Sequence, residues 1–260
     1  MLPDYPPEFW ICAVAAVIFV GIAKAGFGGG VGVVATPLMA LTVPVAEAAA
    51  IMLPLLMVCD FFSVRHYRGD FDRRNVAILL PAAAVGIAVG IAFFDAFSGN
   101  QRVLKAGLGV LGLAFVLFQG VRAALFGVLG KSRPPTWGGL LLGGIAGFTS
   151  TLAHAGGPPV TVYLLPQGLP RQTFVGTTVI LFAAINLIKL GPYCWLGLYH
   201  VGNLMTILVL SPLAYVGVVL GIWLNRRFSD RWFNRLVYGI LFVTGLQLVL
   251  GRSMLEMLLG

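Results

Sequence analysis

The stretch KAGFGGGVGVVATP, residues 24–37, decides how the first part of the chain folds. Five of the seven residues from Gly26 to Gly32 are glycines, and each costs a helix about 1 kcal/mol relative to alanine. The sequence on either side is apolar enough to enter a membrane, where unwound backbone is tolerated only against protein or a water-filled cavity. We therefore predict a broken helix here, whose new helix start offers N–H groups and a positive dipole end to an anion.

The composition is that of an integral membrane protein. Hydrophobic residues make up 59% of the 260 residues and charged residues only 10%, against about 25% charged residues in a soluble domain. Helical spans need about 20 consecutive apolar residues, and residues 75–94, 201–224 and most of 45–64 are such runs. The runs are continuous rather than alternating, which favours helices over an outer-membrane barrel. We expect an all-α polytopic protein of the lipid bilayer.

A second window has the same order of features as the opening stretch. GIAKAGFGGGVGVVATPLMALTVP at 21–44 and GIAGFTSTLAHAGGPPVTVYLLPQGLP at 144–170 both begin with Gly-Ile-Ala, reach a glycine cluster and end in a proline-containing turn. The two windows start at Gly21 and Gly144, roughly half the chain apart. This order indicates an internal repeat, and chance similarity between glycine-rich membrane helices is the alternative.

Each half divides into five apolar segments. They are 9–25, 31–43, 45–65, 75–95 and 102–122, then 137–151, 156–166, 172–191, 200–224 and 232–250. The second segment of each half is too short for a perpendicular span, which predicts a broken helical hairpin. We expect two transmembrane repeats, 1–122 and 137–260, joined by a linker at 123–136. Each repeat would hold a broken hairpin and three further helices, giving eight full spans and the short hairpin halves.

The basic residues decide the topology. If every segment reverses the chain, the basic loops 65–74, 122–133 and 226–235 fall on one side, together with Arg171. Eight simple spans would instead put 65–74 and 226–235 on opposite sides. The positive-inside rule therefore favours inverted halves, with these loops in the cytoplasm and the chain in the plasma (inner) membrane. It also explains the net charge of +8 without a nucleic-acid partner. Inverted repeats with short, interrupted segments are typical of transporters with a midplane site.

Polar residues beside the glycine clusters are candidates for binding an anion. Lys24 precedes the first cluster and His154 the second, and hydroxyl donors stand beside His154 at Thr149 and Ser150. A charge at the centre of a span costs at least about 2.5–3.5 kcal/mol, so such residues are functional candidates. The alternatives are a snorkelling Lys24 and a hydrogen-bonded packing role for His154.

The third segment of each half also carries polar residues. Asp60 and Asn186 lie at comparable places, and Lys189 shares a helix face with Asn186. The Asn186 amide could donate to an anion, whereas Asp60 would repel one. Asp60 is therefore expected to carry a proton or to pair with Lys24 or Arg65. For Lys189, the alternative is an outward snorkelling position.

An enzyme is disfavoured. Ser150 and His154 at i and i+4 resemble a nucleophile–base pair, but no orienting acid accompanies them. The sequence has three histidines and shows no His/Cys/carboxylate cluster that suggests a metal. We expect no catalytic activity, no cofactor and no metal.

Three stretches carry a resemblance to a known family. GFGGGVGVVATPLM at 26–39, GFTSTLAHAGGPPVTVYLLPQGLP at 147–170 and NLIKLGPYCWLGLY at 186–199 resemble the TauE/SafE sulfite exporter family, also called sulfonate uptake and export permeases. The loop RHYRGDFDRRNV at 65–76 is similar to the family's basic loop. The resemblance covers nearly the whole chain. It implies a secondary transporter of sulfite or organosulfonates driven by the proton gradient, with the glycine signatures at Gly28–Gly30 and Gly156–Pro158 and a polar helix position at Asn186.

We therefore expect alternating access around one anion site near the membrane midplane. The candidate substrate-binding residues are Lys24, Gly28, Gly29, Gly30, Thr149, Ser150, His154, Gly156, Gly157, Asn186 and Lys189, with Asp60 as the candidate for proton coupling. The alternative function is a passive anion channel, which would conduct without coupling. A structural scaffold would give the intramembrane polar residues no purpose. The sequence leaves the substrate, the direction of transport and a possible homodimer open.

Overall fold

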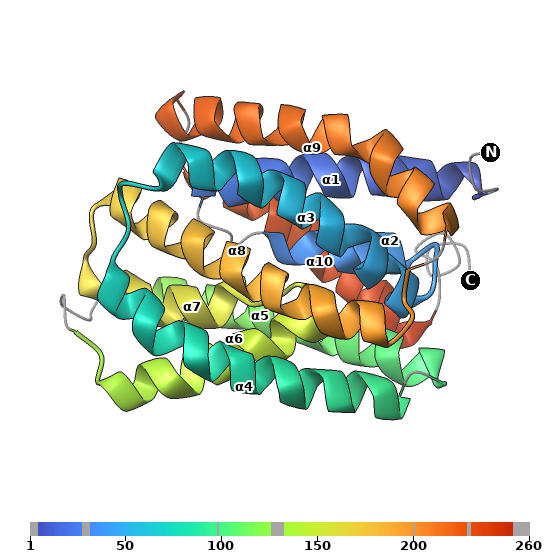
Figure 1. Ribbon diagram of the computed structural model, residues 1–260, viewed down its shortest axis with the longest axis horizontal. Helices are drawn as coiled ribbons and strands as arrows, with labels where there is room; N and C mark the ends of the chain where they lie inside the picture. Colours follow the sequence, from blue (N-terminus) through green and yellow to red (C-terminus); the bar gives the residue numbers. More distant parts are fainter. Residues whose placement is uncertain are drawn as a thin grey trace.

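The computed structural model describes residues 5–27, 32–97, 99–125, 133–199, 201–227 and 230–251, and every regular element in these ranges is a helix (Figure 1). The first half holds α1 (Pro7–Phe27), η1 (Gly32–Val34), α2 (Ala35–Ala40), α3 (Val45–Tyr67), α4 (Arg73–Phe97) and α5 (Gln101–Leu125). The second half holds α6 (Thr136–Ala153), α7 (Gly157–Leu164), η2 (Leu165–Gln167), α8 (Arg171–Trp195), α9 (Val201–Arg227) and α10 (Asp230–Leu250). The predicted all-α class is confirmed, and the predicted segments match these helices to within a few residues.

Six of the described helices are long and apolar enough to cross a membrane. They are α1, α3, α4, α5, α8 and α9, and α10 adds a shorter apolar stretch, Tyr238–Leu250. The chain is therefore a multi-pass membrane protein by length and composition. The predicted count of eight spans also needs α6 and α10, and it stays a prediction.

Helix boundaries lie at both glycine clusters. α1 ends at Phe27 and η1 begins at Gly32, while α6 ends at Ala153 and α7 begins at Gly157. Gly28, Gly29 and Gly30 lie outside the described residues. The second predicted interruption is confirmed, and the short helix α7 follows it. The first falls on residues 28–31 and stays a prediction.

The end of α3, the start of α8 and the last turns of α9 lie at one end of the bundle. His66 and Tyr67 at the end of α3, Arg171 at the start of α8 and Ile222 near the end of α9 line one pocket. Figure 1 shows the α3–α4 and α7–α8 connections at the left, opposite the start of α1. Loops that follow the third and ninth predicted segments thus share an end, as the charge pattern predicts. We call this the basic end.

Glycines allow two helix pairs to pack closely. On α4, a Cβ at Gly86 would overlap the backbone of α6 at Gly144. On α9, a Cβ at Gly221 would lie 2.7 Å from the carbonyl oxygen of Ile22 on α1. Backbones approach this closely only where side chains are absent. Gly90, Gly139, Gly143 and Gly217 make similarly close contacts with a neighbouring helix.

We expect Gly147→Ala to destabilise the protein by about 1–3 kcal/mol, because its Cβ would overlap the backbone of Ala83 on α4 and force the helices apart. Thermal unfolding of the purified protein in detergent measures this loss. Gly120→Ala is the matched control, since no heavy atom outside its own helix turn lies within 4 Å of its Cβ position. Equal midpoints for the two variants would contradict the close α4–α6 contact.

Contacts recur in the two halves at a constant separation. Tyr67 packs against Val175 and Val179, and Tyr193 packs against Ala49 and Leu53. The separation is 126 residues for each of the pairs Tyr67/Tyr193, Ala49/Val175 and Leu53/Val179. The contacts also show that α3 and α8 run antiparallel, because the end of each meets the start of the other.

A close glycine contact also recurs in the two halves, with the contacted residues 126 residues apart and the approaching glycines 131 residues apart. Gly217 on α9 approaches the Ile18 carbonyl oxygen, and Gly86 on α4 approaches that of Gly144. Ile18 and Gly144 are again 126 residues apart. These contacts make Gly21 the counterpart of Gly147, so the Gly-Ile-Ala match of the sequences is shifted by three residues. The alignment of the two halves is therefore taken from the packing contacts rather than from the shared Gly-Ile-Ala sequence.

Candidate functional site

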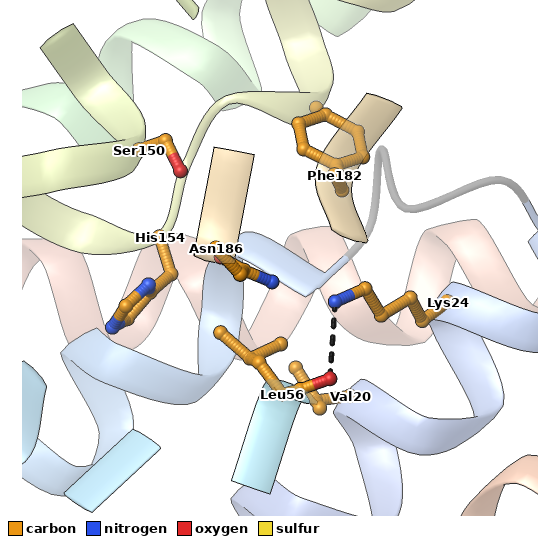
Figure 2. A pocket seen from close by; sticks show the side chains of 8 residues that line it. Val20, Lys24, Leu56, Ser150, His154, Phe182 and Asn186 are labelled. Carbon is orange, nitrogen blue, oxygen red and sulfur yellow. Dashed lines mark hydrogen bonds between the residues drawn. The ribbon is translucent and has the colours of Figure 1, made fainter. Parts of the chain in front are cut away.

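A small cavity lies where α1, α3, α6, α7 and α8 meet (Figure 2). Its lining residues are Val20, Lys24, Leu56, Ser150, His154, Gly157, Phe182 and Asn186. About 30 Å³ is open to the centre of a water-sized sphere, more than the roughly 10–15 Å³ that one water needs. Figure 2 shows the Lys24 ammonium and the Asn186 amide pointing toward the same space from different helices. Five of the predicted candidates line this cavity.

Lys24, Asp60 and Asn186 form a chain of polar contacts across three helices. Lys24 Nζ lies 2.6 Å from Asp60 Oδ1, and Asn186 Nδ2 donates to Asp60 Oδ2 at 2.7 Å. Lys24 Nζ also donates to the Leu56 carbonyl oxygen at 3.3 Å. Lys24 is 4% exposed and Asp60 is 5% exposed. Lys24 therefore does not snorkel, and Asp60 pairs with Lys24 rather than with Arg65.

Lys189 is fully buried, and the hydrogen-bond partners of its side-chain nitrogen are neutral groups. Its ammonium donates to the Ser150 carbonyl at 3.0 Å, to Ser150 Oγ at 2.9 Å and to His154 Nδ1 at 2.8 Å. Its side chain is 0% exposed, so the outward snorkelling alternative is wrong. No carboxylate lies within ion-pairing distance of its Nζ in the part of the chain that the structure describes. A buried cation is stable only when its protons are hydrogen-bonded, and here three acceptors accept all three.

His154 ends α6 in a strained backbone conformation. Its φ is 52°, and it is the non-glycine residue with positive φ within the described ranges. A left-handed residue costs roughly 1–2 kcal/mol unless it is glycine. Two side-chain contacts hold it there, to Lys189 and from Nε2 to the Ala49 carbonyl at 3.0 Å. Because Nδ1 accepts from the ammonium, Nε2 carries the proton and donates, which makes the ring neutral.

Replacements of His154 separate backbone strain from side-chain contacts. His154→Gly and His154→Ala both remove the imidazole, but only glycine relieves the left-handed backbone. We expect the glycine variant to be more stable than the alanine variant by about 1 kcal/mol, in thermal unfolding of the purified proteins. Anion binding should be weakened in both. An alanine variant as stable as the glycine variant would contradict the left-handed cap.

Other predicted candidates lie beside the cavity rather than in it. The Thr149 hydroxyl donates to the carbonyls of Ile145 at 2.8 Å and Ala155 at 3.1 Å, and Thr149 lines a separate pocket between α5, α6 and α7. Gly156 packs tightly, since its Cβ would lie 2.8 Å from the Ala146 carbonyl oxygen. The structure thus does not bring Thr149 or Gly156 to the cavity wall.

The start of α7 offers fewer backbone donors than a typical helix start. Gly157 lines the cavity, but Pro158 and Pro159 follow it and have no N–H. Much of the donor capacity must therefore come from the side chains of Lys24, Asn186 and Ser150. At the start of α7, fewer backbone N–H groups are therefore available to an anion than the glycine cluster predicts.

The charges of the site leave one positive charge in excess. Two ammonium groups, Lys24 and Lys189, accompany one carboxylate, Asp60. In a medium of low dielectric such an excess attracts an anion strongly. In the described ranges no group of three or more His, Cys, Asp or Glu side chains is arranged to hold a metal. The arrangement is suited to binding a small anion.

Two buried tyrosines near the site were missed by sequence reasoning. Tyr67 and Tyr193 each donate a hydrogen bond across to the neighbouring helix of their half. The signal was present, because Tyr67 follows Asp60 by seven residues and Tyr193 follows Asn186 by seven. Seven residues are about two helical turns, so such residues share a face.

The comparison with family models gives one result that bears on this site. The family model described as Sulfite exporter TauE/SafE matches residues 13–248, which is nearly the whole chain and includes every residue of the cavity. Neither the curated proteins nor the solved structures contain a match. The chain belongs to the sulfite exporter TauE/SafE family.

Proposed function

We propose that the chain is a secondary transporter that carries small sulfur-containing oxyanions, such as sulfite or organosulfonates, across the plasma (inner) membrane. The observation that carries the proposal is a cavity lined by Lys24, Ser150 and Asn186, with Lys189 bonded to Ser150 behind the wall and Asp60 as the one carboxylate that pairs with Lys24. The family is one of sulfite exporters, which supports sulfur oxyanions as the substrate class. It is a family of transporters rather than of enzymes.

The cavity residues divide the binding work between charge and hydrogen bonds. Lys24 and the second amide hydrogen of Asn186 would donate to the oxygens of the anion, since both side chains line the cavity. Ser150 lines the cavity and receives one hydrogen bond from Lys189, so its own hydroxyl hydrogen is available for donation. Lys189 would act through Ser150 and through its charge. Charge-assisted hydrogen bonds of this kind are roughly twice as strong as neutral ones.

We infer that the halves are inverted repeats and that the protein works by alternating access. The contacts that recur 126 residues apart and the antiparallel course of α3 and α8 support this inference. A sequence match between the two helices that make the recurring glycine contacts also supports it. The matching stretches are PAAAVGIAVG at 81–90 on α4 and PLAYVGVVLG at 212–221 on α9. With α6 and α10 as counterparts of α1 and α5, eight helices would span the membrane. One half moving against the other would expose the cavity to each side in turn.

Proton coupling is assigned to Asp60. Its carboxylate holds Lys24 and Asn186, the same donors that an anion would need. A proton on Asp60 would weaken these contacts and add one positive charge to the site. Anion binding and proton binding would then favour each other, which is the requirement for coupled transport.

A flux assay in proteoliposomes tests the proposal against a passive anion channel. A carrier would take up sulfite, thiosulfate or a sulfonate with saturation, would show counterflow with unlabelled anion inside, and would respond to a proton gradient. A channel would conduct without counterflow. Transport of none of these anions, by protein that remains monodisperse, would refute the proposed substrate class. Labelling of the loops 65–74, 122–133 and 226–235 from the cytoplasmic side tests the orientation.

A further inference from the structure

Tyr67 and Tyr193 occupy matching places on either side of the cavity. Each lies seven residues after a polar contact residue, Asp60 on α3 and Asn186 on α8. Both side chains are buried, at 5% and 1% exposure. Seven residues advance a helix by roughly 10 Å and return to the same face. Each tyrosine therefore lies about two turns away from the Asp60–Asn186 contact.

Each tyrosine hydroxyl holds the end of a broken helix. Tyr67 Oη donates to the Ala25 carbonyl oxygen at 2.9 Å, and Tyr193 Oη donates to the Thr151 carbonyl oxygen at 2.7 Å. Ala25 and Thr151 are each the third residue from the end, of α1 and α6 respectively. Carbonyls in the last turn lack intrahelical partners and need other donors. The tyrosines supply these donors, so each tyrosine ties α1 to α3 or α6 to α8.

The two tyrosines lie toward opposite ends of the bundle. Because α3 and α8 are antiparallel, Tyr67 meets the start of α8 at Val175, while Tyr193 meets the start of α3 at Ala49. The Asp60–Asn186 contact lies between them. In Figure 1, α3 ends at the left and α8 ends at the right. Tyr67 is therefore on the side of the basic end and Tyr193 on the other side.

Tyr67 borders the open pocket at the basic end. This pocket has a volume of about 380 Å³, which gives room for roughly ten waters or more. Along α3, Tyr67 lies between this pocket and Asp60, whose partners Lys24 and Asn186 line the cavity.

The face of α3 between the cavity and Tyr67 is polar. Ser63 shares the face of Asp60 and Tyr67, and it is 0% exposed. Its hydroxyl has no hydrogen-bond partner among the described residues. Buried hydroxyls are almost always satisfied, so an orphan calls for an explanation. A route that fills with water or anion when the barrier opens would satisfy Ser63.

We propose that Tyr67 and Tyr193 are the two gates of the transport route, Tyr67 toward the basic end and Tyr193 toward the opposite end. The inference rests on the proposed transport function. Both hydrogen bonds are present in the structure, so each broken helix is tied to its neighbour, α1 to α3 and α6 to α8. Opening a gate breaks one hydrogen bond and moves one aromatic ring, which frees the end of α1 or of α6. Alternating access requires that the two gates open in turn.

Side-specific labelling of a cavity cysteine tests the two gates. The reporter is Leu56→Cys, at a cavity-lining position, in a chain whose three cysteines, Cys12, Cys59 and Cys194, are replaced by alanine. Right-side-out and inside-out vesicles are treated with the impermeant anionic reagent sulfonatoethyl methanethiosulfonate, and labelling is followed by mass spectrometry. We expect Tyr67→Phe to speed labelling about tenfold from the basic end only. Tyr193→Phe should speed it about tenfold from the opposite end only, and the double variant from both.

A control variant and a second pair of variants distinguish failure of the gates from misfolding and from a wrong substrate class. Tyr163→Phe removes the hydroxyl of another buried tyrosine, in a separate hydrophobic cluster, and should leave labelling unchanged. Tyr67→Ala and Tyr193→Ala provide wider openings in case phenylalanine still fills the barrier. If monodisperse alanine variants label no faster, or label equally from both sides, the gates are refuted. Labelling does not depend on transport. If the variants label as expected but the protein transports no sulfur oxyanion, the gate proposal stands and only the proposed substrate class is refuted.

Discussion

Lys189→Met is expected to weaken anion binding about 100-fold. The ammonium supplies the positive charge that Asp60 does not neutralise, and it orders Ser150 and His154 at the cavity wall. Methionine has a similar length and no charge, so the formal charge of the site falls to zero. Truncating one partner of a buried, hydrogen-bonded charge pair costs about 2–5 kcal/mol of binding free energy, and each 1.4 kcal/mol is about tenfold in affinity. Titration of the purified variant with a sulfonate, by calorimetry, measures the loss.

The stability of the same variant separates binding from structure. Lys189 is buried without a carboxylate partner in the described part of the chain, so an apolar replacement should keep or raise the unfolding temperature. Affinity should therefore fall while stability does not. Lys105→Met, on the partly exposed face of α5, is the matched control and should bind normally. A Lys189→Met protein that binds a sulfonate within threefold of the native affinity would exclude Lys189 from the site.

The helices and their interruptions are predictable from the sequence because their signals are local. Apolar runs predict α3, α4, α8 and α9, and the glycines at 156 and 157 predict the interruption between α6 and α7. The charge pattern also predicts that the loops at 65–74 and 226–235 share an end. This prediction depends only on how many times the chain reverses between the loops, and not on which helices are in contact.

The details of the site are not predictable in this way, because they depend on helix rotation and pairing. Thr149 and Ser150 are neighbours in sequence, yet they project about 100° apart on α6, and only Ser150 reaches the cavity. Lys189 could snorkel outward or point inward from the same sequence. Its inward position follows from the contact of α8 with α6, which no local pattern specifies. The tyrosines were overlooked because their partners are backbone carbonyls, which leave no mark in the sequence.

Asp60→Asn is expected to remove the pH dependence of sulfonate binding. In the native protein the Asp60 carboxylate pairs with Lys24 and accepts from Asn186, so an anion competes with it for the same donors. Protonation of Asp60 removes that competition and adds one positive charge. Native affinity should therefore rise as the pH falls, by up to about tenfold per pH unit if one proton is linked to binding. A sulfonate is the proper ligand, because its own charge does not change between pH 6 and pH 8.

The asparagine variant holds Asp60 in a state like the protonated one. We expect it to bind the sulfonate at pH 8 about as tightly as the native protein does at pH 6, with no change between these values. Sulfonate uptake into proteoliposomes should persist down its own gradient but should no longer be driven by a proton gradient. Asp95→Asn, at an exposed carboxylate near the end of α4, is the control and should keep the native pH dependence. If Asp60→Asn retains the native pH dependence, then the proton is carried elsewhere and Asp60 serves only to pair Lys24.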